Sequence, residues 1–209
     1  MARLWLVRHG ETEWNAESRI QGHLDPPLNA VGRDQALDAA GRLAAYFRGQ
    51  PAPPIYTSDL RRAAQTAIAI GRALRTRPRV AKKLRERAFG VLEGKTLPEL
   101  AETLPDEVRA YRRGQKDAIP EAEPYAAFCE RAVRAARAIA RREPRAVVVT
   151  HGGVIKAVLR VALGPDAQFM VGNTALYTVD VDPLREVGGI VRVLSEEEVI
   201  SSAQLDPVG

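Results

Sequence analysis

The sequence predicts an α/β fold: a three-layer α/β/α arrangement with a mainly parallel central sheet. Apolar runs of strand length alternate with stretches of helical periodicity along the 209 residues, an order typical of parallel sheets covered by helices. The first run, residues 4–7, is apolar throughout, as expected of a strand buried on both faces. We therefore expect a single domain over residues 1–209, with the irregular segment 89–123 as a small cap insertion.

The elements of the first half follow from local signals. Asn29 is expected to cap a helix that carries apolar residues at helical spacing, and the proline-rich run 51–54 ends it. Residues 55–58 form the next strand, and Ser58 or Asp59 caps the helix that follows.

In the second half the two periodicities alternate again. Helical patterns lie at residues 97–104, 106–113, 125–142 and 154–163. Strand patterns lie at residues 80–81, 146–150, 176–181 and 190–194. The last two strands are expected to be antiparallel or at the sheet edge, and the polar tail after Ser195 is expected to fray.

Composition excludes several classes of protein. Hydrophobic residues make up 45% and charged residues 27% of the chain, which excludes wholesale disorder. No apolar run approaches the ~20 residues that cross a bilayer, and the N-terminal apolar stretch is too short for a signal peptide. The lone Cys129 forms no internal disulfide and supplies no multi-cysteine zinc site. We expect a cytoplasmic protein without a membrane partner, as a monomer or homodimer.

The charge favours an anionic partner. The chain has 31 basic and 26 acidic residues, a formal net charge of +5, and most of the basic residues are arginine. The planar fork of arginine binds phosphate through two hydrogen bonds. Aromatic residues make up only 5%, and no nucleic-acid motif is present, so we expect no nucleic-acid partner. A small phosphorylated metabolite is the expected partner.

Two of the three histidines have the same setting. His9 and His151 each follow an apolar strand pattern and precede a glycine. In an open parallel sheet, ligands bind outside the carboxyl ends of the strands, so neighbouring strands would bring both imidazoles to one site. The start of the helix after Gly152-Gly153 would direct backbone N–H groups to the same place.

Arginines make this edge of the sheet an anion site. Arg8 precedes His9, and one of Arg61 and Arg62 can face back over the end of the strand before them. Two imidazoles and two guanidinium groups without a third metal ligand suit a tetrahedral phosphoryl group and not zinc. For arginines away from such motifs, a solvated surface is the alternative.

Five ordered motifs point to one family. They are Arg8-His9-Gly10-Glu11-Thr12 with Asn15 (R-H-G-E-T-x-W-N), residues 21–28 (Q-G-x-x-D-x-P-L), 58–67 (S-D-L-x-R-A-x-Q-T-A), 84–94 (L-x-E-x-x-x-G-x-x-E-G) and 150–153 (T-H-G-G). Together they resemble the histidine phosphatase superfamily, in its phosphoglycerate mutase-like branch.

The resemblance implies a mechanism and a set of roles. His9 attacks phosphorus and forms a phosphohistidine, Glu86 protonates the leaving alcohol, and His151 holds equatorial oxygens. The implied phosphate-binding residues are Arg8, Arg62, Asn15 and Gly152, and the implied substrate-binding residues are Gln21, Gly22 and Thr12. No cofactor and no metal are implied. For Glu86, a plain surface ion pair with a neighbouring arginine is the alternative.

The family contains both phosphatases and mutases. The short chain and the Q-G-x-x-D segment favour a metal-independent phosphomonoesterase that acts on a small organic phosphate. Candidate substrates are a sugar phosphate, phosphoglycerate, phosphoserine or a ribazole-type phosphate. Phosphoglycerate mutase-type transfer is the alternative, and a non-catalytic phosphate or polyanion binder represents a different class. Residues 121–124 depart from the family's G-G-E-S-like segment, which leaves the substrate contacts expected there open.

Overall fold

A mainly parallel sheet forms the centre of the protein. The computed structural model describes residues 1–209 except 166, 168–169, 183–189 and 195–209. Within the described residues, six strands pair in the order β3-β2-β4-β1-β5-β6. They are β1 (Ala2–Arg8), β2 (Ile55–Thr57), β3 (Arg79–Val80), β4 (Arg145–Thr150), β5 (Leu176–Val181) and β6 (Ile190–Leu194). The first four are parallel, and β5 runs antiparallel to both β1 and the edge strand β6, which confirms the predicted sheet.

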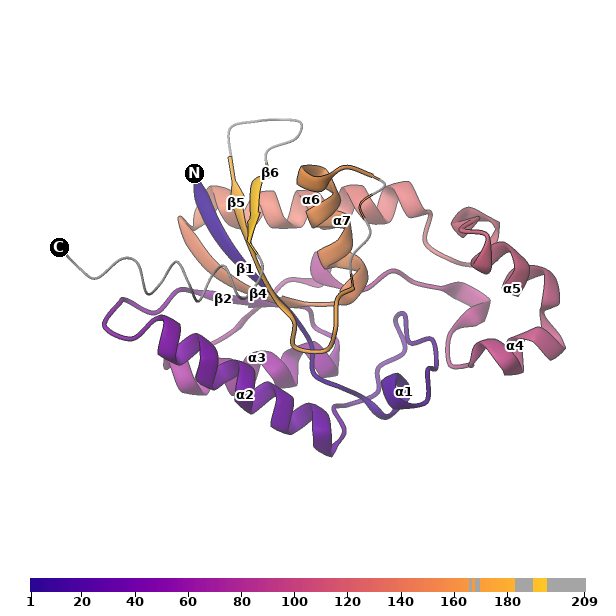
Figure 1. Cartoon of the computed structure of the whole chain (residues 1–209), viewed down its shortest axis with the longest axis horizontal. Helices are drawn as coiled ribbons and strands as arrows, with labels where there is room; N and C mark the ends of the chain where they lie inside the picture. Colours follow the sequence, from indigo (N-terminus) through magenta and orange to yellow (C-terminus); the bar gives the residue numbers. More distant parts are fainter. Residues whose placement is uncertain (166, 168–169, 183–189, 195–209) are drawn as a thin grey trace.

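Helices cover both faces of this sheet (Figure 1). The α-helices of the described residues are α1 (Glu13–Ala16), α2 (Ala30–Tyr46), α3 (Arg61–Leu74), α4 (Leu97–Thr103), α5 (Pro105–Arg112), α6 (Tyr125–Arg142) and α7 (Gly152–Leu163). None of these helices is long and apolar enough to cross a membrane. The predicted N-cap of α2 is confirmed, since the side chain of Asn29 accepts the N–H of Gly32 at 2.7 Å.

Alternate residues of β1 explain the three layers. Trp5 and Val7 pack on one face with residues of α2 and α3, whereas Leu4 and Leu6 pack on the other face with residues of α6 and α7. All four side chains are at most 2% exposed. A strand buried on both faces has to be apolar throughout, which is the pattern seen in residues 4–7. The predicted three-layer α/β/α fold is confirmed.

The start of α3 differs from the prediction. Its N-cap is Leu60, and neither Ser58 nor Asp59 caps the helix through its side chain. The carboxylate of Asp59 instead accepts two hydrogen bonds from Arg85, at 2.7 and 2.6 Å. The N–H of Arg61 is bound at 2.7 Å by the carboxylate of Asp25, which comes from a distant loop. A tertiary contact therefore replaces the expected local cap.

Residues 89–123 have a small hydrophobic cluster of their own. Leu92, Leu100 and Val108 are buried in it, and the helices α4 and α5 lie beside the sheet and not on it (Figure 1). An isolated bridge between Phe89 and Ala122 joins the two ends of the segment. The segment therefore begins and ends next to the loop that carries Glu86. The predicted polar tail after Ser195 lies outside the described residues.

Candidate active site

The two histidines meet where β1 and β4 end. These parallel strands pair in a register that sets Arg8 opposite Thr150, so His9 and His151 follow side by side. The backbone N–H of His9 donates to the carbonyl of Thr150 at 3.0 Å. The ring centroids are 5.2 Å apart with an interplanar angle of 61°. The two imidazoles therefore converge as predicted, although 141 residues lie between them in the chain.

Both rings are buried and neutral. His9 is 3% exposed and His151 is 0% exposed. Burial lowers the pKa of His9 well below its usual range, and the positive charges of Arg62 and Arg8 lower it further. Burial likewise lowers the pKa of His151, and the positive charge of Arg62 lowers it further. Nδ1 of His9 lies 2.7 Å from the carbonyl oxygen of Gly10. A carbonyl only accepts, so this nitrogen carries the proton and Nε2 keeps a free lone pair.

Two arginines flank the histidines. Arg62 is 1% exposed on the inward face of α3, and its guanidinium donates to the carbonyls of Gly22 and Leu24 at 2.8 and 2.9 Å. Burial lowers its pKa to about 10, so it remains charged at neutral pH. Arg8 donates to the carbonyl of Val171 at 2.7 Å. Arg61 is exposed, so the arginine that faces the strand end is Arg62.

Unsatisfied polar atoms collect at this point. Buried atoms without a hydrogen-bond partner among the described residues include Arg8 Nε, Arg62 Nε, both ring nitrogens of His151 and Gln21 Oε1. A buried polar atom left unpaired costs free energy, so such atoms are rare unless a ligand binds them. Their donors and charges suit a tetrahedral anion.

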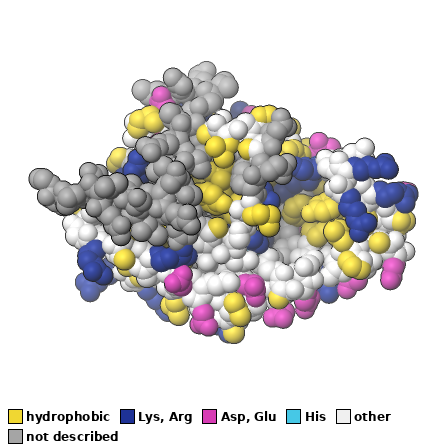
Figure 2. Space-filling model, viewed as in Figure 1, with side chains coloured by type: hydrophobic (Ala, Val, Ile, Leu, Met, Phe, Trp, Pro, Cys, Tyr) yellow, Lys and Arg dark blue, Asp and Glu magenta, His cyan; other side chains and the backbone are white. Residues whose placement is uncertain are grey.

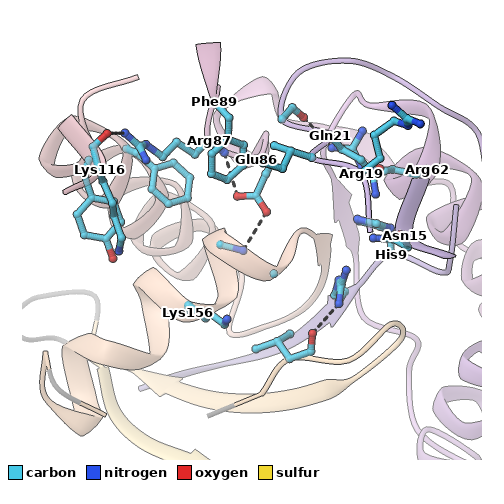
Figure 3. A pocket seen from close by; sticks show the side chains of 18 of the residues that line it. His9, Asn15, Arg19, Gln21, Arg62, Glu86, Arg87, Phe89, Lys116 and Lys156 are labelled. Atoms are coloured by element: carbon cyan, nitrogen blue, oxygen red, sulfur yellow. Dashed lines mark hydrogen bonds between the residues drawn. The ribbon is translucent and has the colours of Figure 1, made fainter. Parts of the chain in front are cut away.

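Glu86 faces the same pocket from the opposite side (Figure 3). Its Oε2 accepts the backbone N–H of Gly153 at 2.9 Å, and its Oε1 accepts the backbone N–H of Arg87 at 2.9 Å. The guanidinium of Arg85 binds Asp59, and that of Arg87 binds the carbonyls of Glu123 and Lys116. The alternative that Glu86 forms an ion pair with these neighbours is therefore wrong.

The remaining predicted residues separate into two groups. Asn15, Gln21, Gly22 and Gly152 line the pocket, whose volume is about 520 Å³. Thr12 does not line it, because its fully buried side chain caps α1, where Oγ1 accepts the N–H of Asn15 at 3.2 Å. The assignment of Thr12 to substrate binding is corrected accordingly: it positions Asn15.

Loop contacts at the pocket escaped the sequence analysis. The carboxylate of Glu93 accepts backbone N–H groups of His23, Leu24 and Phe89, which joins the loop of residues 21–24 to the loop after Glu86. Gly22 has φ +52°, and a Cβ there would lie 1.9 Å from Glu93 Oε1. In the sequence, the only indication of a role for Glu93 is its place as the second glutamate of the L-x-E-x-x-x-G-x-x-E-G motif.

The segment that departs from the family pattern has a structural role. Glu123 accepts two hydrogen bonds from Arg131, at 2.8 and 2.7 Å. The same guanidinium donates to the carbonyls of Lys83, Arg85 and Glu86, which fixes the loop that carries Glu86. Glu121 has φ +60°, a conformation that favours glycine. Neither Glu121 nor Glu123 lines the pocket.

The fold and the site together define an α/β protein with an anion pocket at the carboxyl edge of its sheet. The family model described as "Histidine phosphatase superfamily (branch 1)" matches residues 4–187, so the chain belongs to this family. The described residues contain no group of three His, Cys, Asp or Glu side chains that could hold a metal ion.

Named relatives narrow the class. The "Metal-independent phosphoserine phosphatase" of Arabidopsis thaliana is 37% identical over 204 residues, which cover 94% of this chain and 82% of that protein. The "Probable phosphoglycerate mutase GpmB" of Salmonella arizonae is 37% identical over 188 residues, which cover 86% and 85%. The structure of mycobacterial glucosyl-3-phosphoglycerate phosphatase with VO3 is 28% identical, with a TM-score of 0.75 and coverage of 94% and 98%. The family and its phosphatase members support a phosphatase enzyme.

Proposed function

We propose that the protein is a metal-independent phosphomonoesterase that moves the phosphoryl group of a small organic phosphate to Nε2 of His9 and then to water. The observation that carries this proposal is the state of the His9 ring. The Gly10 carbonyl fixes the proton on Nδ1, and burial beside two arginines keeps the ring neutral. A neutral imidazole with a free Nε2 is the nucleophile that such a transfer needs.

In the first step, a bond forms from Nε2 of His9 to phosphorus while the bond from phosphorus to the ester oxygen breaks. Negative charge on the equatorial oxygens is then stabilised by preorganised donors. The donors proposed at this end of the pocket are Arg8, Arg62, His151, Asn15 and the backbone N–H of Gly152. Since both ring nitrogens of His151 are unpartnered among the described residues, one N–H is free for the phosphoryl group.

Glu86 is the proposed proton donor to the leaving oxygen. Two backbone N–H groups orient its carboxylate at the wall of the pocket. In the second step, water forms the new bond to phosphorus, the bond from phosphorus to Nε2 breaks, and the water proton passes to Glu86. The same group thus acts as acid and then as base.

The relatives support this class of substrate without selecting one compound. One relative is named for phosphoserine and one structure for a glucosylated phosphoglycerate, and both substrates are small organic phosphates. The name of that phosphoserine phosphatase also supports independence from metal. The GpmB relatives support phosphoglycerate mutase-type transfer as the second candidate.

The test compares the native chain with His9→Ala and with the exposed-site control Lys82→Met. We expect p-nitrophenyl phosphate hydrolysis that resists EDTA, persists in Lys82→Met and is lost in His9→Ala. Rapid quench under non-acidic conditions with labelled substrate is expected to trap the label on His9. Label on another side chain would overturn the nucleophile assignment, and tight polyanion binding without turnover would favour a non-catalytic binder.

A second assay separates phosphatase from mutase. The native chain is incubated with 3-phosphoglycerate and 2,3-bisphosphoglycerate, and inorganic phosphate and 2-phosphoglycerate are measured together. We expect release of inorganic phosphate to dominate. Faster formation of 2-phosphoglycerate would assign the mutase reaction to this chain.

A further inference from the structure

The pocket carries more positive charge than one phosphate ester requires. Its lining includes the basic residues Arg8, Arg19, Arg62, Arg87, Lys116, Lys156 and Arg160, while Glu86 is the only carboxylate among the lining residues. Arg8 and Arg62 match the two negative charges of a phosphate monoester at the histidine end. Figure 2 shows further Lys and Arg side chains over the cap end of the molecule, beside a group of hydrophobic side chains.

Some of the other cations are already engaged. Arg19 forms ion pairs with Glu17 and Glu99, at 3.0 and 2.8 Å. Arg87 donates to backbone carbonyls and lies 3.8 Å from Asp117. By contrast, besides Arg8 at the histidine end, three of the lining cations have no carboxylate within ion-pair distance in the described part of the chain. These are Lys116, Lys156 and Arg160.

Lys156 and Arg160 share one face of α7. They follow Gly152 by four and eight residues, so their Cα atoms lie about 6 and 12 Å further along the helix axis. The opposite face, with Val154 and Val158, is buried. In Figure 3, Lys156 projects from α7 between the side of the cavity that holds His9 and the side that holds Lys116. Two unpaired cations therefore follow the phosphate end along the pocket wall.

Arg160 is held in a defined orientation. Its Nη1 donates to the hydroxyl of Tyr125 at 2.8 Å, and the ring of Tyr125 lies 3.4 Å from Nζ of Lys116. The buried Nε of Arg160 has no partner among the described residues. An oriented guanidinium with an unused buried donor beside the pocket indicates a bound anion.

We propose that Lys156 and Arg160 form a second anion subsite, which selects phosphomonoesters that carry a second anionic group. This inference rests on the proposed function, because the transferred phosphate is the first anion. The second group is a carboxylate or a second phosphate. Lys156 suits a group close to the ester, as in a three-carbon acid, and Arg160 extends the subsite to longer substrates.

The test uses two matched pairs of ligands that differ in the second anion alone. They are 3-phosphoglycerate with glycerol 3-phosphate, and fructose 1,6-bisphosphate with fructose 6-phosphate. Calorimetric Kd values are measured in a His9→Ala background, where no turnover occurs. In at least one pair, we expect the ligand with the second anionic group to bind about tenfold or more tightly than the ligand without it. The pair that shows this preference identifies the second group as carboxylate or phosphate.

Two substitutions locate the preference. Lys156→Met and Arg160→Met are expected to remove most of the affinity for the second anion, whereas glycerol 3-phosphate or fructose 6-phosphate keeps its affinity and reports an intact phosphate end. Lys82→Met removes one exposed charge outside the pocket lining and is expected to retain the preference. Melting temperatures of all variants report folding.

The outcomes separate the two proposals. Equal affinities within both pairs, or a preference that survives both substitutions, would overturn the second subsite. Hydrolysis of p-nitrophenyl phosphate by the native chain would still support the proposed phosphatase activity in that case. Absence of that hydrolysis, with the preference intact and lost in Lys156→Met, would overturn the proposed function and leave the subsite in place.

Discussion

Gly153→Ala is expected to displace Glu86 while leaving the fold intact. A Cβ at this position would lie 2.1 Å from Glu86 Oε1 and 3.2 Å from Oε2. Ordinary contact begins at 3.4 Å, so the carboxylate has to shift by about 1.3 Å. The hydrogen bond from the Gly153 N–H, now 2.9 Å long, is then strained or lost. Because the carboxylate ends a flexible side chain, the backbone need not move.

The size of the effect follows from this shift. Misplacement of a catalytic group by about 1 Å costs about 10²-fold in rate, and complete loss of a general acid costs about 10²–10⁴-fold. We therefore expect kcat for alkyl phosphates to fall about 10²-fold, which corresponds to about 2.7 kcal/mol of transition-state free energy. Aryl phosphates have good leaving groups that need little protonation, so their kcat is expected to fall by less than about tenfold.

The assay measures kcat across a series of alkyl and aryl phosphates. Gly153→Ala, Glu86→Gln and the double variant are compared, and Gly41→Ala serves as the control, since a Cβ at that exposed position in α2 meets nothing within 4 Å. The double variant is expected to lose little beyond Glu86→Gln, because both changes act on one group. Equal losses for alkyl and aryl esters, or fully additive losses, would refute the reasoning.

Three further outcomes concern stability. Below pH 6.5 the free energy of unfolding is expected to fall by up to about 1.4 kcal/mol per pH unit for each of His9 and His151, since the folded protein keeps both rings neutral while the unfolded chain binds protons. Urea titrations in phosphate-free buffer test this, and an undiminished slope in His151→Asn would contradict it. Glu121→Gly is expected to raise the free energy of unfolding by about 1 kcal/mol, because glycine adopts φ +60° without the strain of a side chain. A lower urea midpoint for this variant would count against the prediction. Arg131→Met is expected to lower the free energy of unfolding by about 2 kcal/mol, whereas its exposed counterpart Arg134→Met is expected to lower it by less than about 0.5 kcal/mol. Equal losses in the two variants would show that the contacts of Arg131 with the Glu86 loop add no stability.

Local patterns were sufficient for most elements of the fold. The long helix α6 runs from Tyr125 to Arg142 as predicted, because an amphipathic run follows a proline that cannot continue a preceding helix. The meeting of His9 and His151 was also predictable, since each follows a strand whose apolar pattern requires burial. In both cases the prediction rested on a local pattern, namely the amphipathic run of α6 and the strand that precedes each histidine.

Contacts between distant segments that no strand pattern marks were not predictable in this way. The acceptor at the start of α3 is Asp25, which lies 36 positions away from Arg61. The hydroxyl of Thr12 belongs to a signature motif, yet the sequence does not tell whether it faces the pocket or α1. Lys156 and Arg160 read as ordinary helix residues, because only the placement of α7 beside the pocket gives them a common direction.

The arginines of the site have two effects that depend on each other. Arg62 and Arg8 lower the pKa of His9, so the charges that attract a phosphate dianion also keep its nucleophile unprotonated before the phosphate arrives. The bound dianion would remove that effect by neutralising both guanidinium groups. The buried hydrogen bond from Nδ1 to Gly10 then becomes essential, because it keeps the lone pair on Nε2 whatever the charge around it. Burial therefore determines the charge of His9, and the Gly10 carbonyl determines which of its nitrogens can attack.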